Sequence, residues 1–189
     1  MGQRRRSIPL IRIIVLLLVA AVIGYGGYRI LHIQKADKDA EAVLSTMKDL
    51  IPGLGVDTGV STGNGRDPLA TLSINSVDIV GCLEIPSLDL MVPVTVKDEG
   101  GAGFASVVSG SPVKGKFRLT GNREDIFRDL ADAKPDDKVV FTDIDGVRYT
   151  YRVTTQYHLK DWDEGDNDLM VCYDSDSQTQ FVLGCKASE

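Results

Sequence analysis

An apolar segment near the N-terminus limits most strongly what this chain can fold into. Residues 9–31 carry only two charged side chains, Arg12 and Arg29, one near each end. About 20 apolar residues in a row allow a helix to cross ~30 Å of hydrocarbon, and long cationic side chains at its ends can reach the headgroups. We therefore predict a transmembrane helix over residues 9–31, preceded by a short cytoplasmic N-terminus, residues 1–8.

The basic residues beside this segment predict its orientation. Three consecutive arginines occupy residues 4–6, and positive charge is retained on the cytoplasmic side of a first span. A cleaved signal peptide is the alternative, with these arginines as its basic region. The apolar run is long for that role, and no A-x-A cleavage site follows it. Both interpretations place the rest of the chain outside the cytoplasm, and the transmembrane helix, which we favour, would also hold it at the cell membrane.

Residues 32–76 are predicted to be a short helix followed by a flexible linker. Apolar residues recur at helical spacing over residues 34–50, and Pro52-Gly53 is typical of a helix end. Residues 53–76 are rich in Gly, Ser, Thr and Asn, which is typical of a linker. The folded domain is therefore expected to begin at residue 77 and to extend to residue 189.

Short apolar runs with strand-like alternation predict that residues 77–189 are mainly β. Asp145-Gly146 separates two of them and favours a type I′ hairpin turn, while residues 126–133 have the rhythm of a short helix. Many short strands with little helix indicate a closed barrel or a sandwich. The expected strands are residues 79–85, 91–96, 117–119, 138–142, 147–158, 168–172 and 180–184.

Charge and cysteine content exclude several functions. From Asp78 onward there are 21 acidic and 12 basic residues, so nucleic acid is excluded as a partner. No Cys-x-x-Cys motif or Cys/His cluster is present, so we expect no zinc site. The acidic run over residues 161–168 does not match an EF-hand, and we favour a solvated loop there, with a loose calcium site as the alternative. We therefore expect no metal site and no cofactor. Cys82 and Cys185 fall in the first and last predicted strands; we favour two buried thiols, with a disulfide as the alternative.

Cys172 is the candidate nucleophile. It ends an apolar predicted strand and precedes a polar loop, a position from which a thiol can meet a substrate. By composition alone, a buried structural cysteine is the more common interpretation. Carboxylates on both sides of it in the sequence would raise the pKa of the thiol.

Four stretches of the chain resemble the sortases, the cell-surface cysteine transpeptidases of Gram-positive bacteria. Each motif is weak, but their order, their spacing and the preceding membrane segment agree with that family. They are VGCLEIP and MVPV (residues 80–94), GNREDIFRDL (121–130), DKVVFTDIDG followed by YTYRV (137–153), and LMVC followed by QFV (169–182).

The resemblance implies an eight-stranded β-barrel with a short helix, and a cysteine, a histidine and an arginine that act together. Cys172 matches the nucleophile. The histidine would fall at Gly121 or at Asn122, depending on the alignment register, and the arginine would fall at Gln180. Because neither partner is present, the resemblance implies impaired catalysis. His158 is the first candidate for a substitute base, although a packing role is the more common one for such a residue.

Two functions follow from the resemblance. The first is a membrane-anchored cysteine transpeptidase acting on the sorting signals of surface proteins or pilins, impaired by the missing histidine and arginine. The alternative is a non-catalytic pseudo-sortase that binds a surface protein or a pilin-like partner. The retained Cys172 favours the first function, and the two missing partners favour the second. In both, the N-terminal helix would hold the protein at the membrane.

Overall fold

The computed structural model describes residues 10–51, 54–55, 65–96, 101, 103–122, 126–159, 165–175 and 179–188. Helix side chains are described at residues 14–23 and from residue 38 onward. The chain divides into two compact units, Met1–Lys35 and Ala36–Glu189. The predicted cytoplasmic segment, residues 1–8, lies outside the described residues.

One α-helix, α1 (Leu10–Leu50), covers both the predicted membrane segment and the helix predicted over residues 34–50. In the first unit, its described side chains, residues 14–23, are all apolar and all exposed. Among the described residues, no helix is both long enough and apolar enough to cross a membrane. The membrane span over residues 9–31 stays a prediction, and part of it lies outside the described side chains.

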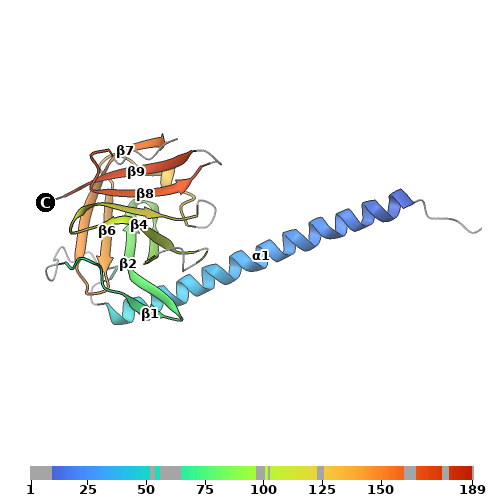
Figure 1. Ribbon diagram of the computed structural model, residues 1–189, viewed down its shortest axis with the longest axis horizontal. Coiled ribbons are helices and arrows are strands. Elements are labelled where there is room, and N and C mark those ends of the chain that lie inside the picture. Colours follow the sequence, from blue (N-terminus) through green and yellow to red (C-terminus); the bar gives the residue numbers. More distant parts are fainter. Residues whose placement is uncertain are drawn as a thin grey trace, which may run out of the picture. The chain divides into compact units, whose positions relative to one another are not determined.

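In the second unit, the described residues form one sheet of nine strands (Figure 1), which confirms the prediction of a mainly β domain. Two 3₁₀ helices are described beside it, η1 (Pro86–Leu88) and η2 (Leu130–Asp132). The strands are β1 (Leu72–Ile74), β2 (Val77–Ile85), β3 (Leu90–Thr95), β4 (Ala105–Ser111), β5 (Gly115–Thr120), β6 (Lys138–Asp143), β7 (Arg148–Leu159), β8 (Leu169–Asp174) and β9 (Gln180–Ala187).

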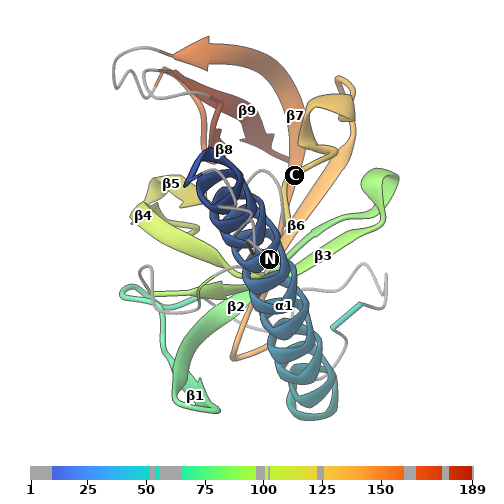
Figure 2. The same ribbon diagram turned by 90° about the vertical axis from the view of Figure 1, so that its right-hand side faces the viewer.

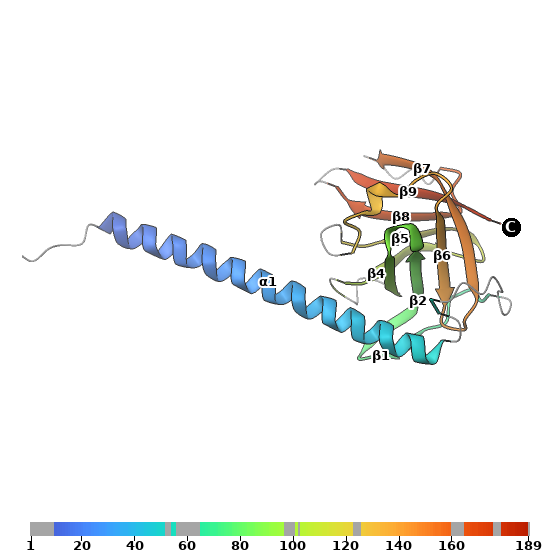
Figure 3. The same cartoon turned by 180° about the vertical axis from the view of Figure 1, so that it is seen from behind.

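The strand pairing forms a closed circuit. The order is β1-β2-β3-β4-β5-β8-β9-β7-β6, and β6 also pairs with β2. Strands β6 and β2 run side by side in Figure 3, and β8, β9 and β7 follow one another in Figure 2. Eight described strands therefore pair in a ring, and β1 is attached outside it through β2.

The main hydrophobic core lies on one face of this ring. Each of the eight paired strands contributes buried side chains to it, and β1 contributes none. Phe117 on β5 and Phe141 on β6 meet edge to face there, with ring centroids 4.9 Å apart, the geometry that aromatic pairs prefer. The strict alternation within the strands thus directs one side of the ring toward a single core.

A second cluster covers part of the other face with the end of α1. Ala40, Val43 and Met47 on the helix are buried with Ile79 and Cys82 on β2. The helix therefore ends as part of the compact unit that begins at Ala36. The segment predicted as a linker, residues 53–76, includes strand β1.

Two local predictions were wrong, and strands β1 and β4 were not predicted. In place of a helix over residues 126–133, the structure has only η2, preceded by turns. The hairpin turn is not type I′, because among its residues only Gly146 has a positive φ, of 83°. Asp143 determines this turn instead: its Oδ1 accepts hydrogen bonds from the N–H groups of Asp145 (3.0 Å) and Val147 (2.9 Å).

Candidate functional site around Cys172

Strand β8 places Cys172 between two partner strands. Cys172 lies opposite Thr120 of the parallel strand β5 and opposite Val182 of the antiparallel strand β9. Its side chain is 0% exposed and packs with Met170 and Val182, on the face away from the main core. Strand β8 is a continuous apolar run because both of its faces are covered.

Arg118 is buried on the same face of the sheet. It lies on β5 two residues before Thr120, and its side chain is 2% exposed. Its Nη2 donates a hydrogen bond of 2.5 Å to Oε1 of Gln180, and the Nε2 of Gln180 donates one of 2.8 Å to Oδ1 of Asp174. The guanidinium also lowers the pKa of the Cys172 thiol, through its charge and as a hydrogen-bond donor. Four side chains are thus connected, from the thiol to a carboxylate.

Burial controls the protonation of Cys172. It raises the pKa of the thiol to about 11, because a thiolate loses hydration in the apolar cluster. Arg118 opposes this rise and Asp174 adds to it. The sequence-based prediction of a raised pKa therefore holds for a different main reason, burial rather than neighbouring carboxylates.

Gly121 and Asn122 follow directly after β5, beside Cys172. The Gly121 N–H donates to the Cys172 carbonyl oxygen at 3.1 Å. A Cβ at Gly121 would lie 2.5 Å from Ile126 Cδ1 and 2.6 Å from Phe127 Cε2, so a side chain there would force Ile126 and Phe127 to move. Asn122 is exposed. Of the two positions proposed for the missing histidine, only Asn122 has space for one.

Similarity to known proteins appears at the level of structure. No family model matches the sequence, and no curated protein matches it. Sortase C-3 from Streptococcus pneumoniae matches with a TM-score of 0.54 at 13% identity, over 82% of this chain and 83% of that chain. Sortase C1 from Streptococcus agalactiae gives 0.52 at 15% identity, over 79% and 89%. This chain has a sortase-like fold.

A third solved structure agrees with this assignment. Sortase A from Listeria monocytogenes matches with a TM-score of 0.50 at 18% identity, over 59% of this chain and 88% of that chain. Sequence identities this low show the fold alone. The predicted resemblance is thus confirmed for the fold, and the roles of individual residues depend on the geometry around Cys172.

His158, the candidate substitute base, does not join Cys172 in the sortase-like domain. His158 packs against Phe181, with ring centroids 5.5 Å apart. Its neighbours Tyr157 and Leu159 pack against the Cys172 cluster, so strand alternation directs His158 to the opposite face. All three cysteines are free and buried, which confirms two separate buried thiols at the first and last of the predicted strands. The described residues contain no cluster of metal ligands.

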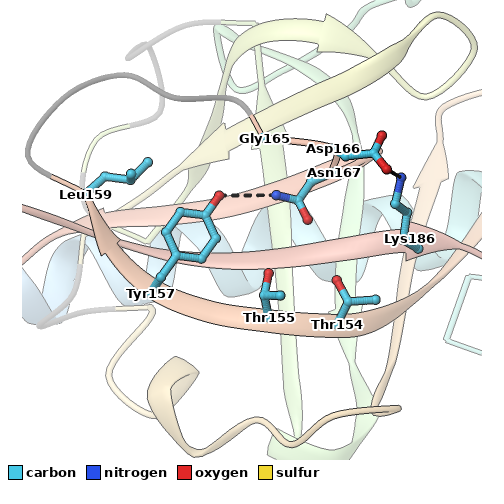
Figure 4. Close-up of a pocket in the computed structure, with 8 residues that line it drawn as sticks. All are labelled: Thr154, Thr155, Tyr157, Leu159, Gly165, Asp166, Asn167 and Lys186. Atoms are coloured by element: carbon cyan, nitrogen blue, oxygen red, sulfur yellow. Dashed lines mark hydrogen bonds and ion pairs between the residues drawn. The ribbon is translucent and has the colours of Figure 1, made fainter.

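A pocket of about 500 Å³ lies beside the Cys172 face of the sortase-like domain (Figure 4). Tyr157 lines it and also packs against the Cys172 cluster. Its phenol oxygen accepts a hydrogen bond of 3.1 Å from Asn167 Nδ2, and Lys186 pairs with Asp166 at 3.0 Å. The pocket offers hydroxyl and amide groups next to an aromatic ring, the mixture of polar and apolar groups that ligand sites use.

Arg118 is the site residue that the sequence analysis missed. One sequence signal could have revealed it: a basic residue between two apolar ones, Phe117 and Leu119, in a predicted strand. Both neighbours are in the main core, so alternation places Arg118 on the opposite face, with Cys172. The pairing of β5 with β8 is what brings the two side chains together.

Ionisation of Cys172 should weaken the folded state at alkaline pH. Its pKa rises from an ordinary 9.0 to about 11 on folding, so the unfolded chain loses the proton first. The resulting stabilisation is complete below pH 9 and is lost as the pH rises toward 11. We expect Cys172→Ala to remove about 1.4 kcal/mol per pH unit from the alkaline slope of the unfolding free energy. Urea unfolding at pH 8, 9 and 10 measures both slopes, and identical slopes would contradict the assignment.

Proposed function

We propose that this sortase-like domain is a pseudo-sortase, which binds the sorting-signal segment of a surface protein or pilin without efficient turnover. One observation carries the proposal: the Cys172 thiol is fully buried, which raises its pKa, and its polar neighbour is a guanidinium rather than an imidazole. A protonated thiol is a poor nucleophile. Without a positioned acid, the leaving amine also gains no proton in the transition state.

Two features support peptide binding: the closed circuit of paired strands and the pocket lined by Tyr157. We take the closed circuit of eight strands to be the predicted eight-stranded barrel, with β8 and β9 as the floor of the binding surface. Tyr157 lies where the pocket meets the Cys172 cluster. Aromatic side chains at such positions contribute strongly to binding.

Peptide binding can be tested with two neighbouring residues on one strand. We expect Tyr157→Ala to weaken the binding of fluorescent sorting-signal peptides by about fivefold or more, measured by anisotropy. His158→Ala is the matched control, because His158 lies on the opposite face of β7 against Phe181. Equal weakening by both substitutions, or no binding by the parent domain to any sorting-signal peptide, would contradict the proposal.

The second candidate function is the impaired transpeptidase. It is favoured by Arg118, whose guanidinium contacts Cys172 and lowers its pKa against the effect of burial. In this case the domain would form a thioester slowly and pass the acyl group to an amine. Detection of that thioester separates the two functions.

We further propose that α1 anchors the protein in a cell membrane, with residues 1–8 in the cytoplasm and the sheet outside. The exposed apolar side chains of residues 14–23 support this topology, because large exposed apolar patches are typical of membrane or protein contacts. Protease added to intact cells should then remove the sheet domain. Complete protection of the domain on intact cells, with digestion only after lysis, would contradict this topology.

A further inference from the structure

Arg118 and Gln180 reach Cys172 from opposite directions. Arg118 is level with Met170 in the β5–β8 register, and Gln180 is level with Asp174 in the β8–β9 register. Cys172 lies midway between these two levels on β8. Because the Arg118 and Gln180 side chains meet at 2.5 Å, their hydrogen bond crosses the central strand at the level of the thiol.

The orientation of the glutamine amide is determined by its two neighbours. Its oxygen accepts from Arg118 and its nitrogen donates to Asp174. The Gln180 amide therefore positions the Arg118 guanidinium, and the Asp174 carboxylate fixes the orientation of that amide. A charged side chain as deeply buried as Arg118, 2% exposed, is costly to keep unless such partners are present.

We propose that Arg118 is the cationic group of this site, acting as the counter-ion that favours the thiolate form of Cys172. The resemblance to sortases places an arginine at position 180; here the guanidinium comes from the neighbouring strand, and Gln180 positions it. A guanidinium has five N–H donors, enough to contact Gln180 and the thiol together.

This assignment changes what Gln180→Arg would do. The resemblance alone suggests that an arginine at 180 would restore a missing group. In the structure, that substitution would place a second guanidinium against Arg118 and remove the oxygen that Arg118 binds. We therefore expect the site to need one arginine and one glutamine at positions 118 and 180, and not two arginines.

Labelling of Cys172 by methyl methanethiosulfonate, a small neutral reagent that reacts with thiolates, tests the proposal directly. Rates would be measured on the full chain from pH 6 to 10, with the labelled cysteine identified by mass spectrometry. We expect Arg118→Gln to slow labelling of Cys172 about tenfold or more, since each unit of pKa changes the thiolate fraction tenfold. If Arg118 only filled space, its truncation would expose the thiol and labelling would become faster. Unchanged or faster labelling overturns the proposal.

Two further variants keep the test decisive. Lys116→Gln removes the same charge from an exposed position on β5, and we expect labelling within about twofold of the parent, because exposed charges are screened. Arg118→Lys keeps a positive charge, although it replaces the planar fork of donors by a compact ammonium. Because a nearby positive charge favours the thiolate, labelling should stay within about threefold of the parent even if Arg118→Gln does not fold. Tenfold slowing by Arg118→Lys would overturn the proposal.

Labelling requires no peptide, so this inference and the proposed function can fail separately. Slowed labelling together with absent peptide binding supports the role of Arg118 as counter-ion and contradicts the pseudo-sortase function. Peptide binding together with unchanged labelling contradicts the role of Arg118 and leaves the binding function supported.

Discussion

Asn122→His is expected to convert residues 36–189 from undetectable to measurable transpeptidation of sorting-signal peptides, a gain of about 10²–10⁴-fold. An imidazole after β5 would lie beside the strand that carries Cys172, as a proton donor to the leaving amine. In its protonated form it would also favour the thiolate. Transfer of a labelled peptide to an amine acceptor, followed by chromatography, measures the gain. Adding Gln180→Arg should give no further increase, because Arg118 already supplies the guanidinium.

The neighbouring glycine provides the control for this experiment. Gly121→His would force a side chain into the space of Ile126 and Phe127, and overpacking of this kind costs about 1–3 kcal/mol. We expect this variant to lose stability in urea and to gain no activity. The opposite result, activity from Gly121→His and none from Asn122→His, would show that the histidine belongs at 121. Efficient turnover by the parent domain, abolished by Cys172→Ala, would contradict the whole account.

A fragment that begins at residue 77, where the sequence predicts the domain to start, is expected to be much less stable than residues 36–189. It lacks the part of α1 that buries Val43 and Met47 against β2. Removal of one such side chain, as in Met47→Ala, costs about 2–5 kcal/mol, so loss of the whole segment should remove a large part of a typical domain stability of about 5–15 kcal/mol. Urea unfolding followed by circular dichroism compares the two fragments and the Met47→Ala variant.

Comparing the two fragments and the Met47→Ala variant shows whether the end of α1 stabilises the folded unit. If residues 77–189 unfold at the same urea concentration as residues 36–189, the end of α1 does not belong to the folded unit. A selective loss in Met47→Ala, with no loss in a variant of an exposed helix residue such as Lys48→Ala, would instead locate the stabilisation in the buried face of the helix.

Strands with alternating or continuous apolar residues were predictable from the sequence, and the two irregular strands were not. Strand β4 (Ala105–Ser111) contains three serines and a glycine, which have low strand propensity. Two register shifts interrupt its pairing with β5, and Gly110 has a φ of 70°. This segment is a strand because it pairs with neighbouring strands, and no local sequence pattern predicts that pairing. The same reason applies to the three residues of β1.

The candidate site was predictable only in part. Cys172 was identifiable as the end of an apolar strand, and Gly121, Asn122 and Gln180 were identifiable by their order in the chain. The choice between Gly121 and Asn122 depended on Phe127, whose buried ring leaves no space at 121. Arg118 joins Cys172 through the pairing of β5 with β8, which the sequence does not encode in any local pattern.

The most direct test of the central claim is the mass of residues 36–189 after incubation with an excess of sorting-signal peptides and no amine acceptor. We expect native mass spectrometry to show a non-covalent peptide complex. After denaturation we expect an unmodified chain, because burial raises the pKa of the Cys172 thiol. A covalent adduct on Cys172 that hydroxylamine removes would be a thioester. Its accumulation would show that Cys172 is an active nucleophile and would contradict the claim.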